Sequence, residues 1–251
     1  MTLFMIGLGL SSKSLTLSGL ESIKSSDLVF LENYTSRLID FDLQKLKDLV
    51  GKDIILADRE LVEVNSDKIL EQAKEKNVSF LVVGDVFSAT THSALFLDAK
   101  KRGINVVVIN NASVLTAVGL TGLSLYRFGR VTTLVFPQAN YFPTSPYEAI
   151  AFNLKNNLHS LVLLDIKNDK LMTINEGLDL LLKLEDKMKE NVIYPDTKVV
   201  GCARLGSEDC IIKYGELSKL KEFDFGKTPH CIVIPAKTHF IEEEMLSLYK
   251  I

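Results

Sequence analysis

The segment NVSFLVVGDVFSATTHSALFLDAKKRGINVVVIN, residues 77–110, determines the predicted fold. Its first part, VSFLVVG at 78–84, is a short apolar run typical of a buried strand. THSALFLDAKKRG at 91–103 has the pattern of a helix that ends at Gly103, a residue suited to the C-cap. NVVVIN at 105–110 is a second β-branched run, so strand-like and helix-like runs alternate here, which predicts an α/β fold with a largely parallel sheet.

The same alternation continues on both sides of this segment. Strand-like runs occur at 2–7, 27–31, 52–57, 132–136, 160–166, 197–206, 209–215 and 230–236, and further helices are expected at 66–77, 145–157, 174–190 and 240–249. Ser66 is the expected N-cap of the helix at 66–77. The strands at 198–203 and 209–213 are separated by only a few turn residues, which predicts an antiparallel pair.

The two series of elements predict two α/β domains, 1–112 with a mostly parallel sheet and 113–251 with a mixed sheet. A ligand cleft is expected between them, because small-molecule sites are common where two lobes meet.

Composition excludes several classes of protein. Of the 251 residues 47% are hydrophobic and 24% charged, which is typical of a globular protein, and the net charge of −3 offers no field that would attract nucleic acid. The beginning lacks signal-peptide features and no apolar run reaches about 18 residues, so we expect a cytoplasmic protein without membrane contact. Cys202, Cys210 and Cys231 lack CxxC spacing, which favours reduced packing residues over disulfides or a metal site.

Glycines follow the first predicted strand, in MIGLGLSS at 5–12. Gly7 and Gly9 match the start of a GxGxxG fingerprint, but the third position is Ser12 and the next helical pattern begins only near Thr16. Glu32, about 20 residues further on, could contact a ribose. A dinucleotide site, a site for another ligand and a plain tight turn therefore remain open.

A second polar turn, GDVFSATTH at 84–92, follows the predicted strand at 78–84. Ligands of open parallel sheets gather beyond the carboxyl ends of the strands, so Asp85 and Ser88 are expected to point toward a ligand crevice. The alternative is that Thr90 or Thr91 caps the following helix and Asp85 only orders the turn.

The third such turn is NNASVLTAVG at 110–119, in which Ser113 is a candidate helix cap or ligand group. The small residues Ala112, Ala117, Gly119 and Gly122 suit either a cofactor face or tight packing. His230 begins a predicted strand, where a structural hydrogen-bonding role is an alternative to ligand binding, whereas His159 and His239 lie outside any motif.

The sequence contains no GxSxG elbow, HExxH helix or Walker loop. Polar turns without a recognisable catalytic group are typical of proteins in which a cofactor supplies the reactive atom and the protein supplies placement.

The sequence resembles the diphthine synthases, a family of tetrapyrrole-methylase-like methyltransferases that use S-adenosylmethionine. The resemblance depends on segments that occur in order along nearly the whole chain. They are MIGLGL (5–10), LENYTS (31–36), ADRE (57–60), VVGDVFSATTHSAL (82–95), NASVLTAVG (111–119), LVLLDIK (161–167) and EMLSLYK (244–250).

The resemblance implies two α/β domains in a homodimer, with the cofactor between the domains. It also implies repeated N-methylation of the α-amino group of a 3-amino-3-carboxypropyl-histidine in translation elongation factor two, a step of diphthamide biosynthesis. The implied contacts to S-adenosylmethionine are Leu10, Asp85, Ser88, Ser113, Val114, Leu164, Leu205 and His230. No catalytic base is implied.

This sequence departs from the family pattern at Val86, where proline is usual, and at Ser88, where a glycine or small apolar residue is common. Loss of proline releases the φ restraint, so we expect a looser loop that still binds. Two alternatives keep the fold. They are a methyltransferase of a tetrapyrrole or ribosomal RNA, and a catalytically decayed module that only binds S-adenosylmethionine. A nicotinamide dehydrogenase using Gly7, Gly9 and Glu32 is a third.

Overall fold

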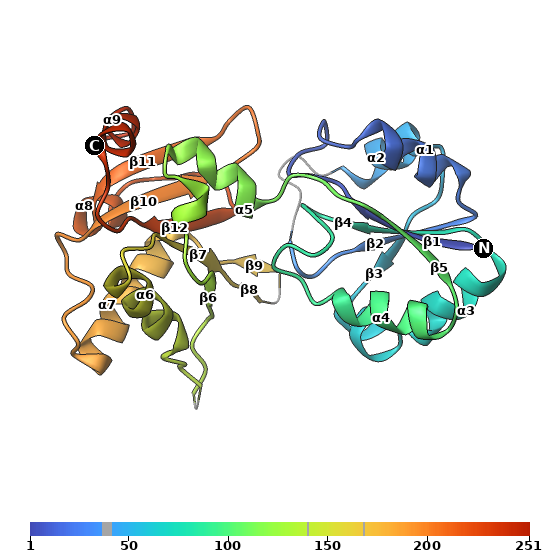
Figure 1. Cartoon of the computed structure of the whole chain (residues 1–251), viewed down its shortest axis with the longest axis horizontal. Coiled ribbons are helices and arrows are strands. Elements are labelled where there is room, and N and C mark those ends of the chain that lie inside the picture. The colour runs from blue at the N-terminus through green and yellow to red at the C-terminus, as the bar shows by residue number, and fades with distance from the viewer. Residues whose placement is uncertain (37–41, 140, 168) are drawn as a thin grey trace. The chain divides into compact units, whose positions relative to one another are not determined.

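The computed structural model describes residues 1–36, 42–139, 141–167 and 169–251. These residues divide into two compact units, Met1–Val114 and Leu115–Ile251. Each contains one five-stranded sheet with its own hydrophobic core (Figure 1). The α/β fold predicted from the alternation of strand and helix patterns is confirmed. The boundary of the units lies at Val114, beside the expected one at residue 112.

The first unit contains a parallel sheet with the strand order β3-β2-β4-β1-β5. Its elements are β1 Thr2–Gly7, α1 Leu17–Ser25, β2 Leu28–Glu32, α2 Leu43–Val50, β3 Ile55–Ala57, the π-helix η1 Glu60–Val64, α3 Asp67–Glu75, β4 Val78–Val82, α4 Ser93–Lys101 and β5 Asn105–Ile109. The helices α1 and α2 cover one face of this sheet, and α3 and α4 cover the other (Figure 1).

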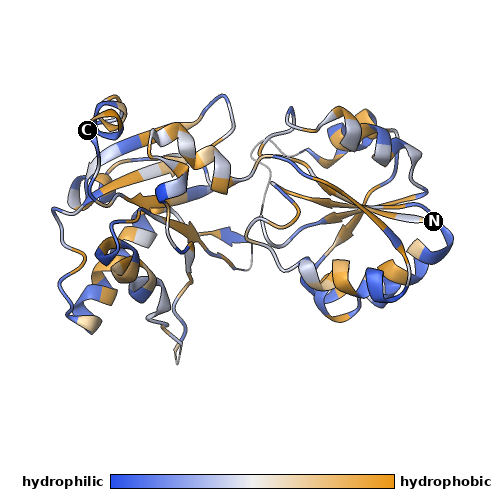
Figure 2. Ribbon diagram, viewed as in Figure 1, coloured by the Kyte–Doolittle hydropathy of each residue, from blue (hydrophilic) through white to orange (hydrophobic). Residues whose placement is uncertain are grey.

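Burial explains why β4 is central and β3 lies at an edge. All five residues of β4 are buried, as expected for a parallel strand covered on both faces, whereas Ile55 and Leu56 of β3 are exposed. In Figure 2 the strands of this sheet are mainly hydrophobic, whereas the helices around it mix hydrophobic and hydrophilic residues. Thr16 caps α1 by accepting from Gly19 N at 3.0 Å. Ser66 occupies the N-cap position of α3, as predicted, but its side chain makes no capping hydrogen bond there.

The second unit contains a mixed sheet with the order β11-β10-β12-β7-β6, in which only β6 and β7 run parallel. Its elements are η2 Val118–Thr121, η3 Leu125–Arg127, β6 Thr132–Leu134, α6 Ser145–Lys155, β7 Ser160–Leu164, β8 Ile166–Lys167, β9 Lys170–Leu171, α7 Ile174–Met188, β10 Lys198–Ala203, β11 Ile211–Glu216, α8 Leu217–Lys221, β12 His230–Ile234 and α9 Phe240–Ser247. The short helix α5, Val114–Ala117, begins at the boundary of the units.

The predicted antiparallel pair in the second unit is confirmed, with Cys202 opposite Ile212. Its second strand begins at Ile211 rather than at residue 209, because Asp209 binds Arg204 and so belongs to the turn. Cys202 and Cys231 face each other across β10 and β12, buried and free, as the packing interpretation predicts. Among the described residues, no helix is long and apolar enough to cross a membrane.

Candidate functional site

The three polar turns singled out in the first unit follow β1, β4 and β5, which are neighbours in the sheet. Because these strands are parallel, their carboxyl ends lie at one edge. The first two turns are joined directly, since Gly9 N donates to Gly84 O at 3.0 Å and Gly84 N donates to Gly9 O at 2.8 Å. Gly9 and Gly84 have φ angles of +73° and +79°, in the left-handed region that favours glycine.

Asp85 ties the turn after β4 to the turn after β5. One carboxylate oxygen accepts from Phe87 N at 3.1 Å and Ser88 Oγ at 3.2 Å. The other accepts from Asn110 Nδ2 at 2.9 Å and Asn111 N at 3.1 Å. Although burial acts to raise it, these hydrogen bonds hold the pKa of Asp85 below its usual value. A carboxylate usually accepts about four hydrogen bonds, and all four are formed within the chain. Asp85 therefore acts on the site by positioning the residues that donate to it.

Asn111 completes this connection, a role that was not predicted from the sequence. Its Nδ2 donates to Gly7 O at 2.9 Å and to Ser14 O at 3.0 Å, so the turn after β5 also holds the turn after β1. The available signal was a pair of amide side chains, Asn110 and Asn111, at the end of a parallel strand and shortly before Ser113. Asp85 and Asn111 together make the three turns one polar structure.

The remaining predicted residues of the first unit lie on these same turns. Leu10, Ser88 and Val114 are partly exposed, and Ser113 is 4% exposed immediately before α5. A Cβ placed on Gly84 would lie 3.7 Å from the Ser113 Cβ, so the two turns approach with no bulky side chain between them. The structure therefore brings Leu10, Asp85, Ser88, Ser113 and Val114 to one edge of one sheet.

Side chains restrain the turn at Val86, where the family pattern has proline. The Val86 carbonyl oxygen accepts from Thr90 Oγ1 at 2.7 Å and lies 3.3 Å from Nδ1 of the buried His92. The Val86 side chain is fully buried in the core. The helix-cap interpretation of Thr90 and Thr91 is wrong, because α4 begins after His92 without a side-chain cap and Thr91 binds Glu63 instead.

The predicted residues of the second unit also gather at one sheet edge. Leu164 ends β7, His230 begins β12, and Leu205 follows β10 by two residues. The strands β7, β12 and β10 are neighbours, with Cys231 opposite Leu163 and Ala203 opposite His230. The predicted residues thus form two groups, one at an edge of each sheet.

The ring nitrogens of His230 are both used within the chain. Its Nδ1 accepts from Ile174 N at 3.2 Å, so Nε2 carries the proton and donates to Lys227 O at 3.0 Å. Burial, the larger cause, and the charge of Arg204 lower the pKa of His230 to about 4. The imidazole is therefore neutral at pH 7, and because its lone pair at Nδ1 is used by Ile174 N, it has a structural hydrogen-bonding role and no free nitrogen to act as a base. A contact with cofactor stays a prediction.

Arg204 organises this second edge, although only its neighbour Leu205 was predicted as a site residue. Its guanidinium is buried and donates to Asp209 Oδ2 at 2.7 Å and Phe225 O at 2.8 Å, and also to Lys227 O. Lys227 O is the same oxygen that receives His230 Nε2. The sequence signal for this role was a charged residue directly after the largely apolar strand β10.

Glu32 does not have the surroundings that the dinucleotide alternative requires. Its carboxylate is buried and accepts from Tyr34 N, Thr35 N and Thr35 Oγ1, each at 2.5 Å. The side chain thus closes the turn after β2 and does not face a ribose. Gly122 serves packing, since a Cβ there would lie 2.2 Å from Met245 Cβ.

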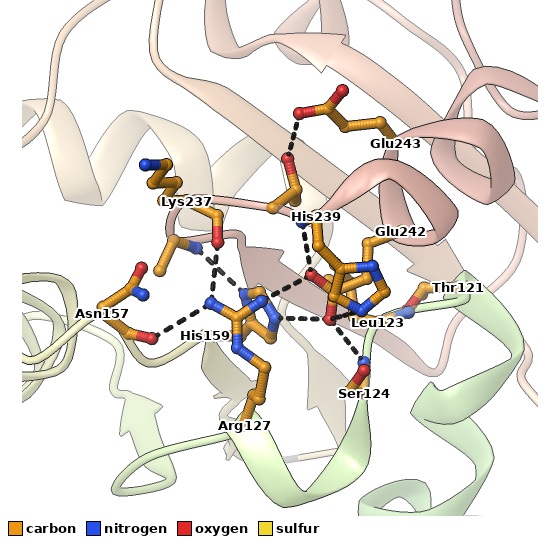
Figure 3. A network of polar contacts seen from close by, with 12 residues as sticks. Thr121, Leu123, Ser124, Arg127, Asn157, His159, Lys237, His239, Glu242 and Glu243 are labelled. Atoms are coloured by element: carbon orange, nitrogen blue, oxygen red, sulfur yellow. Dashed lines mark hydrogen bonds and ion pairs between the residues drawn. The ribbon is translucent and has the colours of Figure 1, made fainter.

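A further polar cluster in the second unit surrounds the buried Glu242 (Figure 3). Its carboxylate receives Arg127 Nη1 at 2.7 Å, Ser124 N at 3.0 Å and His159 Nε2 at 3.2 Å. His159 Nδ1 accepts from Ala236 N at 3.0 Å, so the ring connects the end of β12 to α9. Despite burial, hydrogen bonds from Ser124, His239 and His159 lower the pKa of Glu242 to about 2. His159 is buried in this cluster and has a structural role.

Comparison with known proteins decides the family. A family model for tetrapyrrole (corrin/porphyrin) methylases matches residues 2–221. Diphthine synthases of Methanococcus maripaludis and Methanocaldococcus jannaschii are 46% and 45% identical over 247 and 249 residues, which cover 97% of this chain and 97% of each relative. The chain belongs to the tetrapyrrole methylase family, among the diphthine synthases. The resemblance inferred from the segments is confirmed.

The similarity extends to the three-dimensional structure. A solved crystal structure of a diphthine synthase superposes with a TM-score of 0.91 at 37% identity, covering 100% of this chain and 96% of that one. The two-sheet fold is therefore that of a tetrapyrrole methylase.

Proposed function

We propose that this chain is a diphthine synthase that transfers methyl groups from S-adenosylmethionine to translation elongation factor two. The acceptor is the α-amino nitrogen of a 3-amino-3-carboxypropyl-histidine, and the transfer is repeated as a step of diphthamide biosynthesis. The observation that carries the proposal is similarity to diphthine synthases along nearly the whole chain, combined with the polar turns that Asp85 and Asn111 join.

The turns of the first unit fit a cofactor that is held largely through backbone groups. Gly84 keeps the approach to its backbone open, since a Cβ there would meet nothing closer than 3.7 Å, and Leu10, Ser88 and Val114 on the same turns are partly exposed. We propose that these residues and Ser113, held in place by Asp85, bind S-adenosylmethionine, and that Leu164, Leu205 and His230 bind the same molecule.

Placement accounts for the proposed reaction. S-adenosylmethionine, when bound, supplies a methyl group on a sulfonium sulfur. An α-amine with a pKa of about 8 is partly neutral at pH 7, so it can attack without a dedicated strong base. The chain then has to hold donor and acceptor in line, an effect that can be worth about 7–11 kcal/mol. The hydrogen bonds of Asp85 and Asn111 hold the turns in advance of binding.

Mass spectrometry of the acceptor tests the proposal. The purified chain, S-adenosylmethionine and elongation factor two bearing the 3-amino-3-carboxypropyl group should yield a factor heavier by one methylene per transfer. A porphyrinogen and ribosomal RNA should remain unmodified under the same conditions. A binding module without activity would leave all three unchanged while still binding S-adenosylhomocysteine in calorimetry. A dehydrogenase would bind NAD more tightly than S-adenosylhomocysteine.

We also propose that the chain forms a homodimer in the cytoplasm, where elongation factors act. Supporting the dimer, segment 118–127 and α9 pack together in the second unit and expose large apolar side chains. Tyr126, Phe240 and Leu248 are 86%, 75% and 72% exposed. Such groups of exposed apolar residues mark protein interfaces. Light scattering should give twice the chain mass, and Phe240→Glu should reduce it to that of one chain.

A further inference from the structure

Residues from three segments that carry the family resemblance meet beyond the carboxyl ends of β2, β3 and β4. Tyr34 lies in the turn after β2, Arg59 follows β3, and Thr91 lies in the later part of the turn after β4. Thr91 Oγ1 donates to Glu63 Oε1 at 2.9 Å, and Tyr34 Oη lies 3.4 Å from Thr91 Oγ1. The Arg59 guanidinium carbon lies 5.3 Å from the centre of the Tyr34 ring. We call Tyr34, Arg59, Glu63 and Thr91 the Tyr34 cluster.

Two buried residues, Glu32 and His92, support the Tyr34 cluster. The Glu32 carboxylate fixes the turn that carries Tyr34, because it accepts from Tyr34 N and from Thr35. The ring of His92 packs edge to face against both Tyr34 and Phe80, with centroid distances of 6.2 and 5.2 Å. His92 is fully buried, and its Nε2 has no hydrogen-bond partner in the described parts of the chain.

Unusual backbone conformations occur in the segments that form this cluster. Glu63 lies in the π-helix Glu60–Val64, a rare conformation that is frequent at functional sites. Ala89 has a φ of +59°, a left-handed value that is costly for a residue other than glycine. Ala89 separates Ser88, on the proposed cofactor side of the loop, from Thr91, on the cluster side. Ser88 and Thr91 thus belong to one loop, with the left-handed residue Ala89 between them.

The charges of the cluster are accessible and weakly paired with each other. The side chains of Arg59 and Glu63 are 68% and 34% exposed, and Arg59 Nε lies 4.0 Å from Glu63 Oε1, at the limit of an ion pair. An exposed pair of this kind contributes at most about 1 kcal/mol. A ligand that carries both a carboxylate and an amine can therefore replace it at little cost.

We propose that the Tyr34 cluster recognises the amino-acid end of the acceptor side chain, with Arg59 binding its carboxylate and Glu63 and the Tyr34 ring facing its amine. The inference rests on the proposed function, which supplies an acceptor with both groups on one carbon. Guanidinium groups bind carboxylates through two parallel hydrogen bonds.

The aromatic ring suits an amine that gains methyl groups. A methylated amine loses N–H donors with each transfer, and a quaternary ammonium has none. A carboxylate and an aromatic face still attract such a cation, since neither requires a hydrogen bond from it. In the structure the Arg59 guanidinium already lies over the Tyr34 ring, which shows that this face accepts a cation.

Direct binding measurements test the inference. The chain, saturated with S-adenosylhomocysteine, is titrated with elongation factor two bearing the 3-amino-3-carboxypropyl group and with the unmodified factor. Arg59→Gln should weaken binding of the modified factor about 10- to 100-fold, the range of a charge-assisted hydrogen bond, and leave S-adenosylhomocysteine binding unchanged. Arg59→Lys should recover part of the loss. Arg102→Gln is the matched control, because Arg102 also pairs with carboxylates in this unit but follows α4, at the opposite end of the sheet.

Each outcome bears on the inference separately from the proposed function. The inference is overturned if Arg59→Gln binds the modified factor as tightly as the unchanged chain does. It is also overturned if Arg59→Gln loses as much affinity for S-adenosylhomocysteine as for the modified factor. A chain that binds the modified factor through Arg59 but transfers no methyl group would refute the activity and leave the recognition site standing. A chain that does not distinguish modified from unmodified factor refutes the recognition site, whatever its activity.

Discussion

The carboxylate of Asp85 accepts a hydrogen bond from the backbone of Asn111, 3.1 Å away and 26 positions further along the chain. Through this bond the turn after β4 holds the turn after β5, and the Asn111 side chain then holds the turn after β1. Local interactions within one turn do not produce such an arrangement, so these turns respond to substitution together.

Asp85→Ala should therefore reduce both stability and cofactor affinity. The substitution leaves four donors without their acceptor, and we expect a loss of about 2–4 kcal/mol in the free energy of unfolding. S-adenosylhomocysteine affinity should fall at least about tenfold. Urea unfolding and calorimetry measure the two quantities. Asp53→Ala, at an almost fully exposed carboxylate, is the control and should change neither. Unchanged affinity in Asp85→Ala would remove Asp85 from the site.

Gly7→Ala should separate the two glycine turns. A Cβ at position 7 would lie 2.6 Å from the Gly84 carbonyl oxygen, which is backbone and cannot rotate away. We expect a loss of about 1–3 kcal/mol in stability together with weaker binding of S-adenosylhomocysteine. Gly119→Ala, where the added atom meets Leu125 only at 3.4 Å, provides the comparison in thermal unfolding. Equal unfolding temperatures for Gly7→Ala and Gly119→Ala would contradict this prediction. They would show that the contact between the two turns leaves room for a side chain at position 7.

Stability should fall as the pH is lowered from about 6.5 to about 4, because His230 is neutral in the folded chain. Its folded pKa of about 4 lies below the ordinary value of 6.5, so the unfolded chain binds a proton first. The stabilisation is complete above pH 6.5 and declines by about 2–3 kcal/mol as the pH falls to 4. Urea unfolding across this range measures the decline.

His230→Asn provides the control for the pH experiment. Asparagine offers both an acceptor for Ile174 N and a donor for Lys227 O but does not titrate. The decline between pH 6.5 and 4 should become shallower in this variant. An unchanged slope would assign the pH dependence to other groups, such as His159, whose pKa burial also lowers.

Glu242→Gln should destabilise the second unit by about 3–5 kcal/mol. The substitution leaves the Arg127 guanidinium, whose side chain is mostly buried, without its carboxylate. Thermal unfolding measures this loss. Glu243→Gln, at the neighbouring exposed carboxylate that binds Thr238, should have little effect. Similar unfolding temperatures for the two variants would show that the Glu242 cluster does not stabilise the unit.

Much of this structure follows from the sequence because the determining signals are local. The buried run of β4 and Gly103 after α4 define one strand and one helix end from neighbouring residues alone. The partners of Asn111 and Arg204 could not be predicted, because they are mainly backbone carbonyls of residues elsewhere in the chain, which leave no mark in the sequence. Thr90 was misinterpreted for a related reason, since its hydroxyl binds Val86 O where a cap was expected.

The strand order of the first unit separates two tasks by position. The turns after β1 and β5 lie to one side of β4, and the turns after β2 and β3 lie to the other. If the first side holds the methyl donor and the second selects what is methylated, evolution can exchange the acceptor while conserving the donor site. Proteins that share this sheet could in this way act on chemically unrelated substrates. Exchanging the turns after β2 and β3 between two such proteins would then be the direct way to change which substrate is methylated.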